Sequence, residues 1–339
     1  MYNLHSTLYL SFERKLMVWF KRLLLITTIL TLIVIVFGSY VRLTDAGLGC
    51  PDWPGCYGFV FFPTSGEEIA IAESRFPMFP YEIDKAIPEV VHRYFAAALG
   101  LIAIALMTIA YRTDAAKHIK SLTTFLFFFI CLQGLFGYLT VSLKLLPIVV
   151  TGHLFGGFIT LSLFFYVFLH SSGILSKIRI PQLRGLTLIA LALLIIQIFL
   201  GAWTSTNYAS LACADFPACH GSYWPNMDFK EGFNFFHEIG PNYLYGQLEN
   251  DARTAIHYMH RLNAILVALV YAFLIYKLFQ FGAGQLSAAL GIVLITQISL
   301  GIMNVVFVLP LYVAIAHNLV AAMLLLTTLS AYYVTREHN

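Results

Sequence analysis

Residues 148–170 read IVVTGHLFGGFITLSLFFYVFLH, an apolar run that contains no Asp, Glu, Lys or Arg. A helix needs about 20 such residues to cross a bilayer, so this segment predicts a membrane-spanning helix. Residues 312–334 read YVAIAHNLVAAMLLLTTLSAYYV and have the same length and character. Each run carries a histidine at its sixth position, His153 and His317. The two segments therefore predict helices of one design, each with a histidine near the same end.

The whole chain has the composition of a membrane protein. Hydrophobic residues make up 59% of it and charged residues only 11%, whereas soluble proteins carry about 25% charged residues. Eight apolar runs are long enough to span a bilayer, at roughly 20–41, 89–111, 122–141, 148–170, 184–204, 255–277, 285–306 and 312–334. Their richness in Leu, Ile, Phe and Gly favours a helical bundle over a barrel. We predict an all-α membrane protein with eight transmembrane helices.

Polar and small residues recur at a nearly constant offset along the chain. The same offset separates His153 from His317, Gln133 from Gln297 and Gly137 from Gly301. A slightly shorter offset separates Cys50 and Cys56 from Cys213 and Cys219. A slightly longer offset separates His92-Arg93 from His260-Arg261. Such repetition is typical of an internal duplication. It predicts two duplicated four-helix bundles, residues 1–175 and residues 176–339.

The charged residues orient this bundle in the membrane. Lys and Arg gather in segments that share one side if there are eight spans: Arg14, Lys15, Lys21, Arg22, Arg112, Lys117, Lys120, Lys177, Arg179, Arg184, Lys277 and Arg336. The positive-inside rule makes this side cytoplasmic, with both termini inside. The two long loops, about 42–88 and 205–254, hold most of the acidic residues and would lie outside. We predict a multi-pass protein of a bacterial inner membrane, and the net charge of +3 indicates no nucleic-acid partner.

The amino-terminal segment does not resemble a cleavable signal peptide. Its apolar run is too long, and no small-residue cleavage site follows it. Met17 precedes this run and is an alternative translation start to Met1; the sequence does not decide between them.

Four of the five cysteines lie in the two long loops. Cys50 and Cys56 enclose five residues, as do Cys213 and Cys219, and each enclosed segment contains proline. So short a loop in an oxidising compartment favours a local disulfide in each. Unpaired thiols and a metal site, the latter suggested by His220 beside Cys219, are the alternatives. Cys131 lies mid-helix and is expected to be a small core residue.

Four histidines occupy duplicated positions within apolar segments: His92, His153, His260 and His317. An ionisable residue inside a membrane is costly unless it has a partner, so it suggests a functional site. In this topology all four lie near the outer face at similar depth, with His92 opposite His153 and His260 opposite His317. Two imidazoles on facing helices suit the axial positions of a haem iron, whereas zinc would need more ligands. A hydrogen-bonded packing role is the alternative for each histidine.

Charged residues beside these histidines suggest further roles. Arg42, Arg93 and Arg261 could pair with haem propionates or anchor the helix ends at the membrane interface. Glu89 lies one turn before His92, where the other half has His257 one turn before His260. This difference suggests that one half performs chemistry and the other carries electrons, with Glu89 as a proton-transfer or water-positioning group. The alternative for Glu89 is a carboxylate that stabilises a helix start.

Residues 38–58, GSYVRLTDAGLGCPDWPGCYG, resemble the first-loop signature of the heme A synthase family. Glu89-x-x-His92-Arg93, Gly152-His153, His260-Arg261 and His317-Asn318 are similar to that family's other landmarks, so the resemblance covers about residues 18–335. It implies an eight-helix enzyme that oxidises the C8 methyl group of haem O to the formyl group of haem A. It also implies that His92 and His153, with Glu89, receive the substrate haem, and that His260 and His317 hold a haem b cofactor.

The resemblance and the residues together set the expected partners. The chain has no Gly-x-Gly-x-x-Gly fingerprint, so electrons would come from a membrane or protein donor. Haem O synthase and the cytochrome oxidase assembly machinery are the expected protein partners, and the oligomeric state, including a homo-oligomer, is left open. Two other classes use the same histidines: a dihaem b-type electron-transfer cytochrome and a haem-handling membrane protein. The Cys50–Cys56 signature and the Glu89/His257 difference favour the enzyme.

Overall fold

The computed structural model describes residues 2–113 and 117–336; Met1, one of the two candidate translation starts, lies outside them. Within these residues the chain is helical and has no strands. The eight long helices are α1 (Tyr2–Leu43), α3 (Ile83–Arg112), α4 (Lys117–Ser142), α5 (Pro147–Ser172), α6 (Arg184–Thr206), α8 (Asn250–Gln280), α9 (Gly284–Val306) and α10 (Leu311–Thr335). All eight contain segments that are long and apolar enough to cross a membrane. The predicted all-α membrane fold is confirmed, and each predicted run lies inside one helix.

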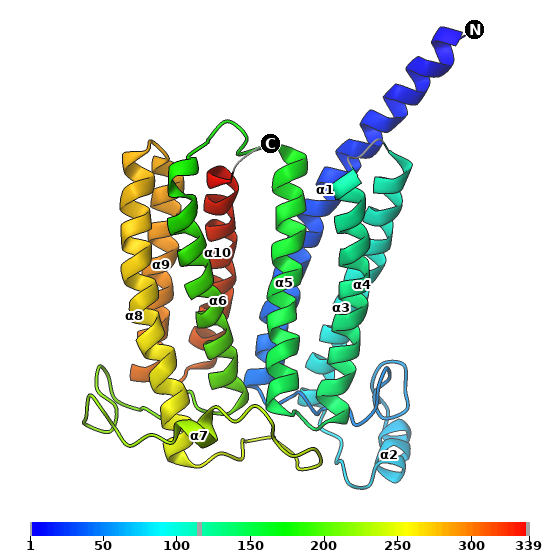
Figure 1. Cartoon of the computed structure of the whole chain (residues 1–339). Coiled ribbons are helices and arrows are strands. Elements are labelled where there is room, and N and C mark those ends of the chain that lie inside the picture. Colours follow the sequence, from blue (N-terminus) through cyan, green and yellow to red (C-terminus); the bar gives the residue numbers. More distant parts are fainter. Residues whose placement is uncertain (1, 114–116, 337–339) are drawn as a thin grey trace.

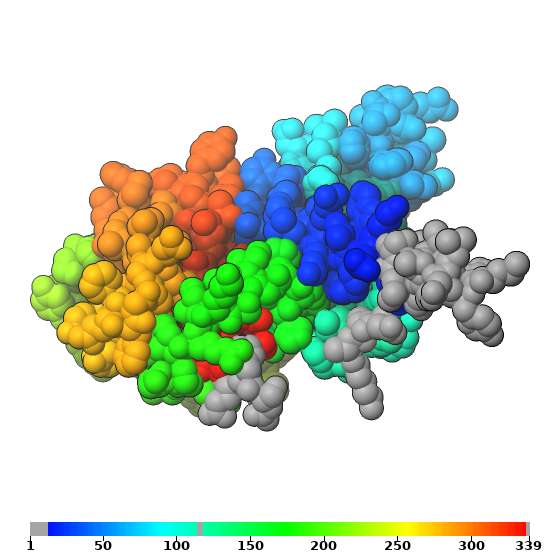
Figure 2. Space-filling view, turned by 90° about the horizontal axis from the view of Figure 1, so that it is seen from above, coloured from blue at the N-terminus to red at the C-terminus, as the bar shows by residue number. Residues whose placement is uncertain are grey.

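The long helices pack in two groups of four (Figure 1). In the first group, α1 and α4 each pack against both α3 and α5. In the second group, α6 and α9 each pack against both α8 and α10. The groups meet where α5 contacts α6 and α10, and where α1 contacts α10 (Figure 2). The same packing order in both groups pairs α1 with α6, α3 with α8, α4 with α9 and α5 with α10.

The two long connections lie together at one end of the bundle, which we call the loop end (Figure 1). They comprise residues 44–82 and 207–249 and contain the short helices α2 (Gly66–Arg75) and α7 (Phe229–Gly232). Helix α2 begins with a capping box, in which Ser65 accepts from the Glu68 backbone N–H and the Glu68 side chain reaches back to Ser65. Helix α1 begins and α10 ends at the opposite end of the bundle (Figure 1).

Several helices begin earlier than their apolar runs predicted, among them α1 at Tyr2, α3 at Ile83 and α8 at Asn250. His92 and His260 therefore lie well inside their helices rather than at their first turns. The extra turns of α3 and α8 contain charged residues, among them Asp84, Lys85, Asp251 and Arg253, so a search for apolar runs does not include them.

The largest buried cluster includes residues from both helix groups, among them Leu161 on α5, Leu194 on α6 and Ala331 on α10. Helix α4 contributes little to the buried core, and Cys131 on it is exposed. The expectation that Cys131 is a core residue was therefore wrong. Lipid is as apolar as the core, so the composition of a spanning helix does not say which face is buried.

Candidate functional site

The predicted histidines lie in two pairs toward the loop end. In the first group, the rings of His92 on α3 and His153 on α5 have centroids 6.4 Å apart and planes at 85°. Metal–imidazole bonds of about 2.0–2.1 Å would place two facing ring nitrogens roughly 4 Å apart, which this separation accommodates. In the second group, His260 on α8 and His317 on α10 are close enough to interact electrostatically. The structure thus brings together the residues that the sequence paired.

Unpartnered ring nitrogens fit these pairs for metal ligation. The Nδ1 atoms of His92, His153 and His317 are buried and have no hydrogen-bond partner among the described residues. A buried polar group left unpaired costs roughly 1–3 kcal/mol, which a metal bond at the ring would offset. The described residues contain no cluster of three or more His, Cys, Asp or Glu that could hold a metal ion. Two facing histidines are the donor set that a haem iron takes, so the residues fit haem.

Each of the four imidazole rings packs against a glycine on a neighbouring helix. A Cβ atom built on that glycine would lie close to the ring Cε1 atom in every case: 2.8 Å for Gly38 and His92, 3.5 Å for Gly137 and His153, 3.1 Å for Gly201 and His260, and 3.2 Å for Gly301 and His317. The absence of a side chain at these positions lets each ring lie directly on the backbone of the next helix. The glycines therefore set the depth of the four rings in the bundle.

Gly38→Ala is expected to weaken haem O binding about 5- to 100-fold, since overpacking of this kind costs about 1–3 kcal/mol. The new Cβ would lie 2.8 Å from His92 Cε1, and real Cβ contacts are not that short. Gly137→Ala is the matched control, because its Cβ would lie at an ordinary contact distance of 3.5 Å from the His153 ring. Titration of both purified variants with haem O measures the difference. Equal haem O affinities of Gly38→Ala and Gly137→Ala would contradict the inference that the missing side chain of Gly38 makes room for the His92 ring.

Each helix group is capped by a small disulfide loop. Cys50 is bonded to Cys56 and Cys213 to Cys219, which confirms the predicted pairing. The carboxylate of Asp52 accepts from the N–H groups of Tyr57 (2.6 Å) and Gly58 (2.8 Å). In the second loop the equivalent Asp215 accepts from His220 (2.7 Å) and Gly221 (2.8 Å). The hydrogen bond from the Gly221 N–H has the largest effect and, together with that from the His220 N–H, holds the pKa of the Asp215 carboxyl below its usual range.

Mass spectrometry of non-reduced peptides is expected to show both pairs crosslinked and Cys131 as a free thiol. Reduction should destabilise each closed loop by about 2 kcal/mol, the amount expected for a loop this short. Free thiols at Cys50, Cys56, Cys213 and Cys219 in freshly isolated protein would contradict the assignment.

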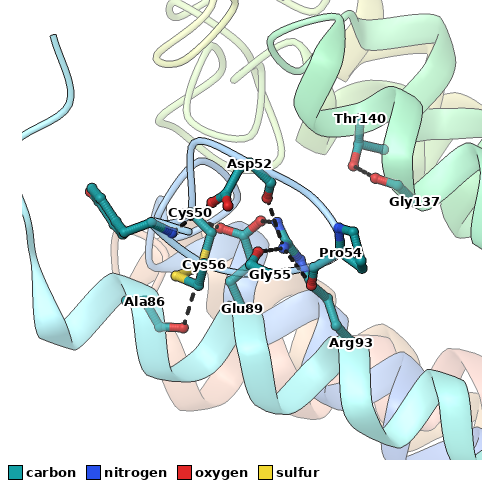
Figure 3. Close-up of polar contacts among 11 residues, drawn as sticks. Cys50, Asp52, Pro54, Gly55, Cys56, Ala86, Glu89, Arg93, Gly137 and Thr140 are labelled. Atoms are coloured by element: carbon teal, nitrogen blue, oxygen red, sulfur yellow. Dashed lines mark hydrogen bonds and ion pairs between the residues drawn. A yellow bond between two sulfur atoms is a disulfide. The ribbon is translucent and has the colours of Figure 1, made fainter. Parts of the chain in front are cut away.

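An arginine from the histidine-bearing helix fastens each loop. Arg93 Nη1 donates to the carbonyl oxygens of Asp52 (2.9 Å) and Gly55 (2.6 Å), and Figure 3 shows its guanidinium inside the first loop. Arg261 Nη1 donates to the Asp215 carbonyl (2.9 Å), and its Nη2 donates to the Cys213 carbonyl (2.6 Å). Because His92 and His260 directly precede these arginines, the loops are tied to the histidine positions.

Glu89 and His257 occupy matching places beneath the two loops. The Glu89 carboxylate is 5% exposed, accepts from the Cys50 backbone N–H at 2.9 Å and pairs with Arg93 (Figure 3). His257 Nδ1 accepts from the Cys213 backbone N–H at 3.3 Å, and its Nε2 accepts from Arg261 Nε at 3.1 Å. Glu89 and His257 therefore each hold a loop in place. Of these two side chains, only the Glu89 carboxyl can carry a negative charge.

The three arginines predicted to pair with propionates all have protein partners. Arg93 and Arg261 hold the loops, as described above. Arg42 donates through Nη2 to the Ser205 carbonyl at 2.5 Å and lies 3.9 Å from the centroid of the Tyr208 ring. Tyr208 in turn donates to Asp45 at 2.8 Å. Arg42 thus links the two helix groups at the loop end.

The sequence is similar to proteins of one family. A family model described as cytochrome oxidase assembly protein matches residues 21–329. The heme A synthase of Shewanella oneidensis is 44% identical over 315 residues, which cover 92% of this chain and 95% of that protein. The chain belongs to the heme A synthase family. The heme A synthases of Rickettsia prowazekii, at 27% identity over 93% of the chain and 98% of that protein, and of Anaplasma marginale, at 28% over 85% and 86%, are also similar to it.

Several features of this heme A synthase family member were not predicted from the sequence. Gly38 and Gly201 have the same separation along the chain as Cys50 and Cys213, and so do Asp52 and Asp215. A search at the separation of the cysteines would therefore have identified the glycine pair and the aspartate pair. Gln197 precedes Gly201 by four residues, as Gln133 precedes Gly137 and Gln297 precedes Gly301, so this recurring spacing would have found it. Asn263, which donates to Gln197, has Phe95 at the matching place in the first half, so no repeat pointed to it.

Proposed function

We propose that the chain is a membrane-bound oxidoreductase that converts haem O to haem A by oxidising the C8 methyl group to a formyl group. The family membership supports this reaction, and the two facing histidine pairs support two haem sites. The observation that carries the proposal is the difference beneath the loops. Two matching sites differ in Glu89 against His257, as expected if one site performs chemistry and the other only transfers electrons.

In this proposal, residues 1–175 hold the substrate and residues 176–339 hold the cofactor. His92 and His153 bind the iron of haem O, while His260 and His317 bind a haem b. The bound haem b would supply a redox centre beside the substrate. The four glycines and the two loops keep the rings in place, so the reacting methyl group is presented to a fixed protein surface.

The reaction requires protons to move beside the substrate. The methyl group becomes an aldehyde by two successive hydroxylations, through an alcohol and a gem-diol that loses water, and each hydroxylation consumes an oxygen-donating oxidant from outside the chain. Glu89 is the carboxylate nearest to His92 along α3, at one helical turn, and is buried beneath the Cys50–Cys56 loop. A carboxylate in that place can accept a proton or position water during these steps.

The setting follows from the same proposal. The protein would lie in a bacterial inner membrane with its basic segments and both termini inside and its haem sites toward the outer face. Electrons would come from a membrane or protein donor. Haem O synthase would deliver the substrate, and the cytochrome oxidase assembly machinery would receive the product.

Extraction of non-covalent haem from purified protein tests the proposal. Protein made in cells that also contain haem O synthase is expected to yield haem O or haem A together with haem b. A dihaem electron-transfer cytochrome would use the same four histidines but would yield two equivalents of haem b. That result, with no haem A formed from added haem O, would overturn the proposed reaction.

A further inference from the structure

The side chain of Arg253 on α8 has no partner among the described residues. Its Nε–H group is buried without an acceptor, and its guanidinium forms no salt bridge with any described acid. A guanidinium carries several N–H donors, and a buried donor left unpaired costs free energy. Arg42, Arg93 and Arg261, by contrast, all donate to main-chain carbonyl oxygens. Arg253 is therefore available to bind an anionic ligand.

Arg253 lies on the face of α8 that carries His260. It precedes His260 by seven residues, which corresponds to about 10 Å along a helix and only about 20° around it. Because α8 begins at Asn250, Arg253 is on the loop-end side of His260. Arg261 lies about 100° around the helix from His260, and it donates to the second disulfide loop. Of the two arginines on α8, Arg253 is thus the one that shares a face with the histidine.

The matching position in the first helix group is also basic. Lys85 precedes His92 by seven residues, as Arg253 precedes His260. The Lys85 ammonium, however, forms an ion pair with Glu82, and Nζ lies 2.9 Å from Oε2. The duplication therefore keeps a basic residue at one place relative to the histidine, and only the first group supplies that residue with an acidic partner.

A haem between His260 and His317 would bring two propionate carboxylates to this region. The axial ligands of a haem iron lie on opposite faces of the macrocycle, so a macrocycle between histidines of α8 and α10 extends along both helices. Charged carboxylates are costly inside a membrane, so the propionates favour the ring edge nearer the loop end. Arg253 lies on that side, two helical turns from His260. A guanidinium binds a carboxylate through two parallel hydrogen bonds, which an ammonium cannot form.

We propose that Arg253 binds a propionate carboxylate of the haem held by His260 and His317. This inference rests on the proposed haem b site and does not depend on the conversion of haem O. In the first helix group, Lys85 would have to leave Glu82 before it could bind a propionate. A fixed arginine suits a cofactor that stays bound, whereas a lysine shared with Glu82 suits a substrate that must leave as product.

Titration with haem b and with its dimethyl ester, in which both propionates are blocked, tests the proposal. All proteins carry His153→Ala, so that His260 and His317 are the remaining facing pair and the low-spin spectrum reports haem at that pair. Arg253→Ala should weaken haem b binding about 10-fold, the lower end of the range for a hydrogen bond to a charged group. The affinity for the dimethyl ester should not change. Arg253→Lys keeps the charge and should lose less affinity for haem b than Arg253→Ala.

Lys85→Ala is the matched control, because it removes a positive charge from the duplicated position in the other helix group. It should leave both affinities at the second pair unchanged. If Arg253→Ala does not accumulate, Arg253→Gln is measured in its place. Equal losses for haem b and the ester would show a structural role and overturn the proposal, as would no loss for haem b. If the protein with His153→Ala alone forms no low-spin haem b, the proposed haem b site is itself wrong, which distinguishes that failure from a failure of Arg253.

Discussion

Replacing Glu89 with glutamine is expected to lower haem A formation by about 10²- to 10⁴-fold, the usual contribution of a general acid–base group. Glutamine keeps the size of the side chain and can still accept from the Cys50 N–H, which the carboxylate accepts at 2.9 Å. It loses the negative charge and the capacity to take up a proton. The haem b proposed for His260 and His317 should remain, while haem O or the hydroxylated intermediate accumulates. Chromatography of extracted haems measures all of these species.

A second variant separates catalysis from loop anchoring. Glu89→His copies the second helix group, in which His257 accepts from the Cys213 N–H and from Arg261. If Glu89 only anchors the loop, Glu89→His should make haem A at a near-normal rate. If the carboxylate takes part in the oxidation, this variant should be as inactive as Glu89→Gln while its disulfide stays intact. Near-normal haem A formation by either variant would require the catalytic role to be withdrawn.

Replacing His260 or His317 with alanine is expected to abolish the low-spin haem b spectrum completely. In the proposed site each ring would supply one of two axial ligands, and alanine would leave that position of the iron open. Optical and electron paramagnetic resonance spectra of purified variants, normalised to protein, measure the loss. His237→Ala in the second loop is the matched control, because His237 belongs to neither pair. An unchanged haem b spectrum in both His260→Ala and His317→Ala would rule out this ligand assignment.

The membrane fold could be predicted almost completely from the sequence. Lipid imposes a length on every spanning helix, so eight apolar runs gave eight helices. The pairing of His92 with His153 followed from alternating helix direction, because residues near the start of two parallel helices share one end of the bundle. The duplication supplied a second, independent copy of each expected position.

Contacts between helices could not be predicted in the same way. Apolar residues occur on every face of α4, so Cys131 could not be placed against lipid rather than core. Nothing in the sequence pairs His118 with His170, yet their Nε2 atoms are 2.7 Å apart. Gln197 and Asn263 are distant in the sequence, and only the packing of α6 on α8 brings them together. The loop carbonyls that Arg93 and Arg261 contact cannot be recognised in a sequence, and their pairing with propionates stays a prediction.

The two helix groups stand side by side with their long loops at one end (Figure 1). Both histidine pairs lie in the halves of their helices that adjoin this end. An electron that passes between these positions would travel parallel to the membrane plane. Moving a charge across the full membrane takes about 2.3 kcal/mol per 100 mV, but a lateral step crosses almost none of that voltage. The transfer between the two sites would therefore proceed equally in energised and de-energised membranes, and a cell could make its oxidase cofactor before its respiratory chain has built any voltage.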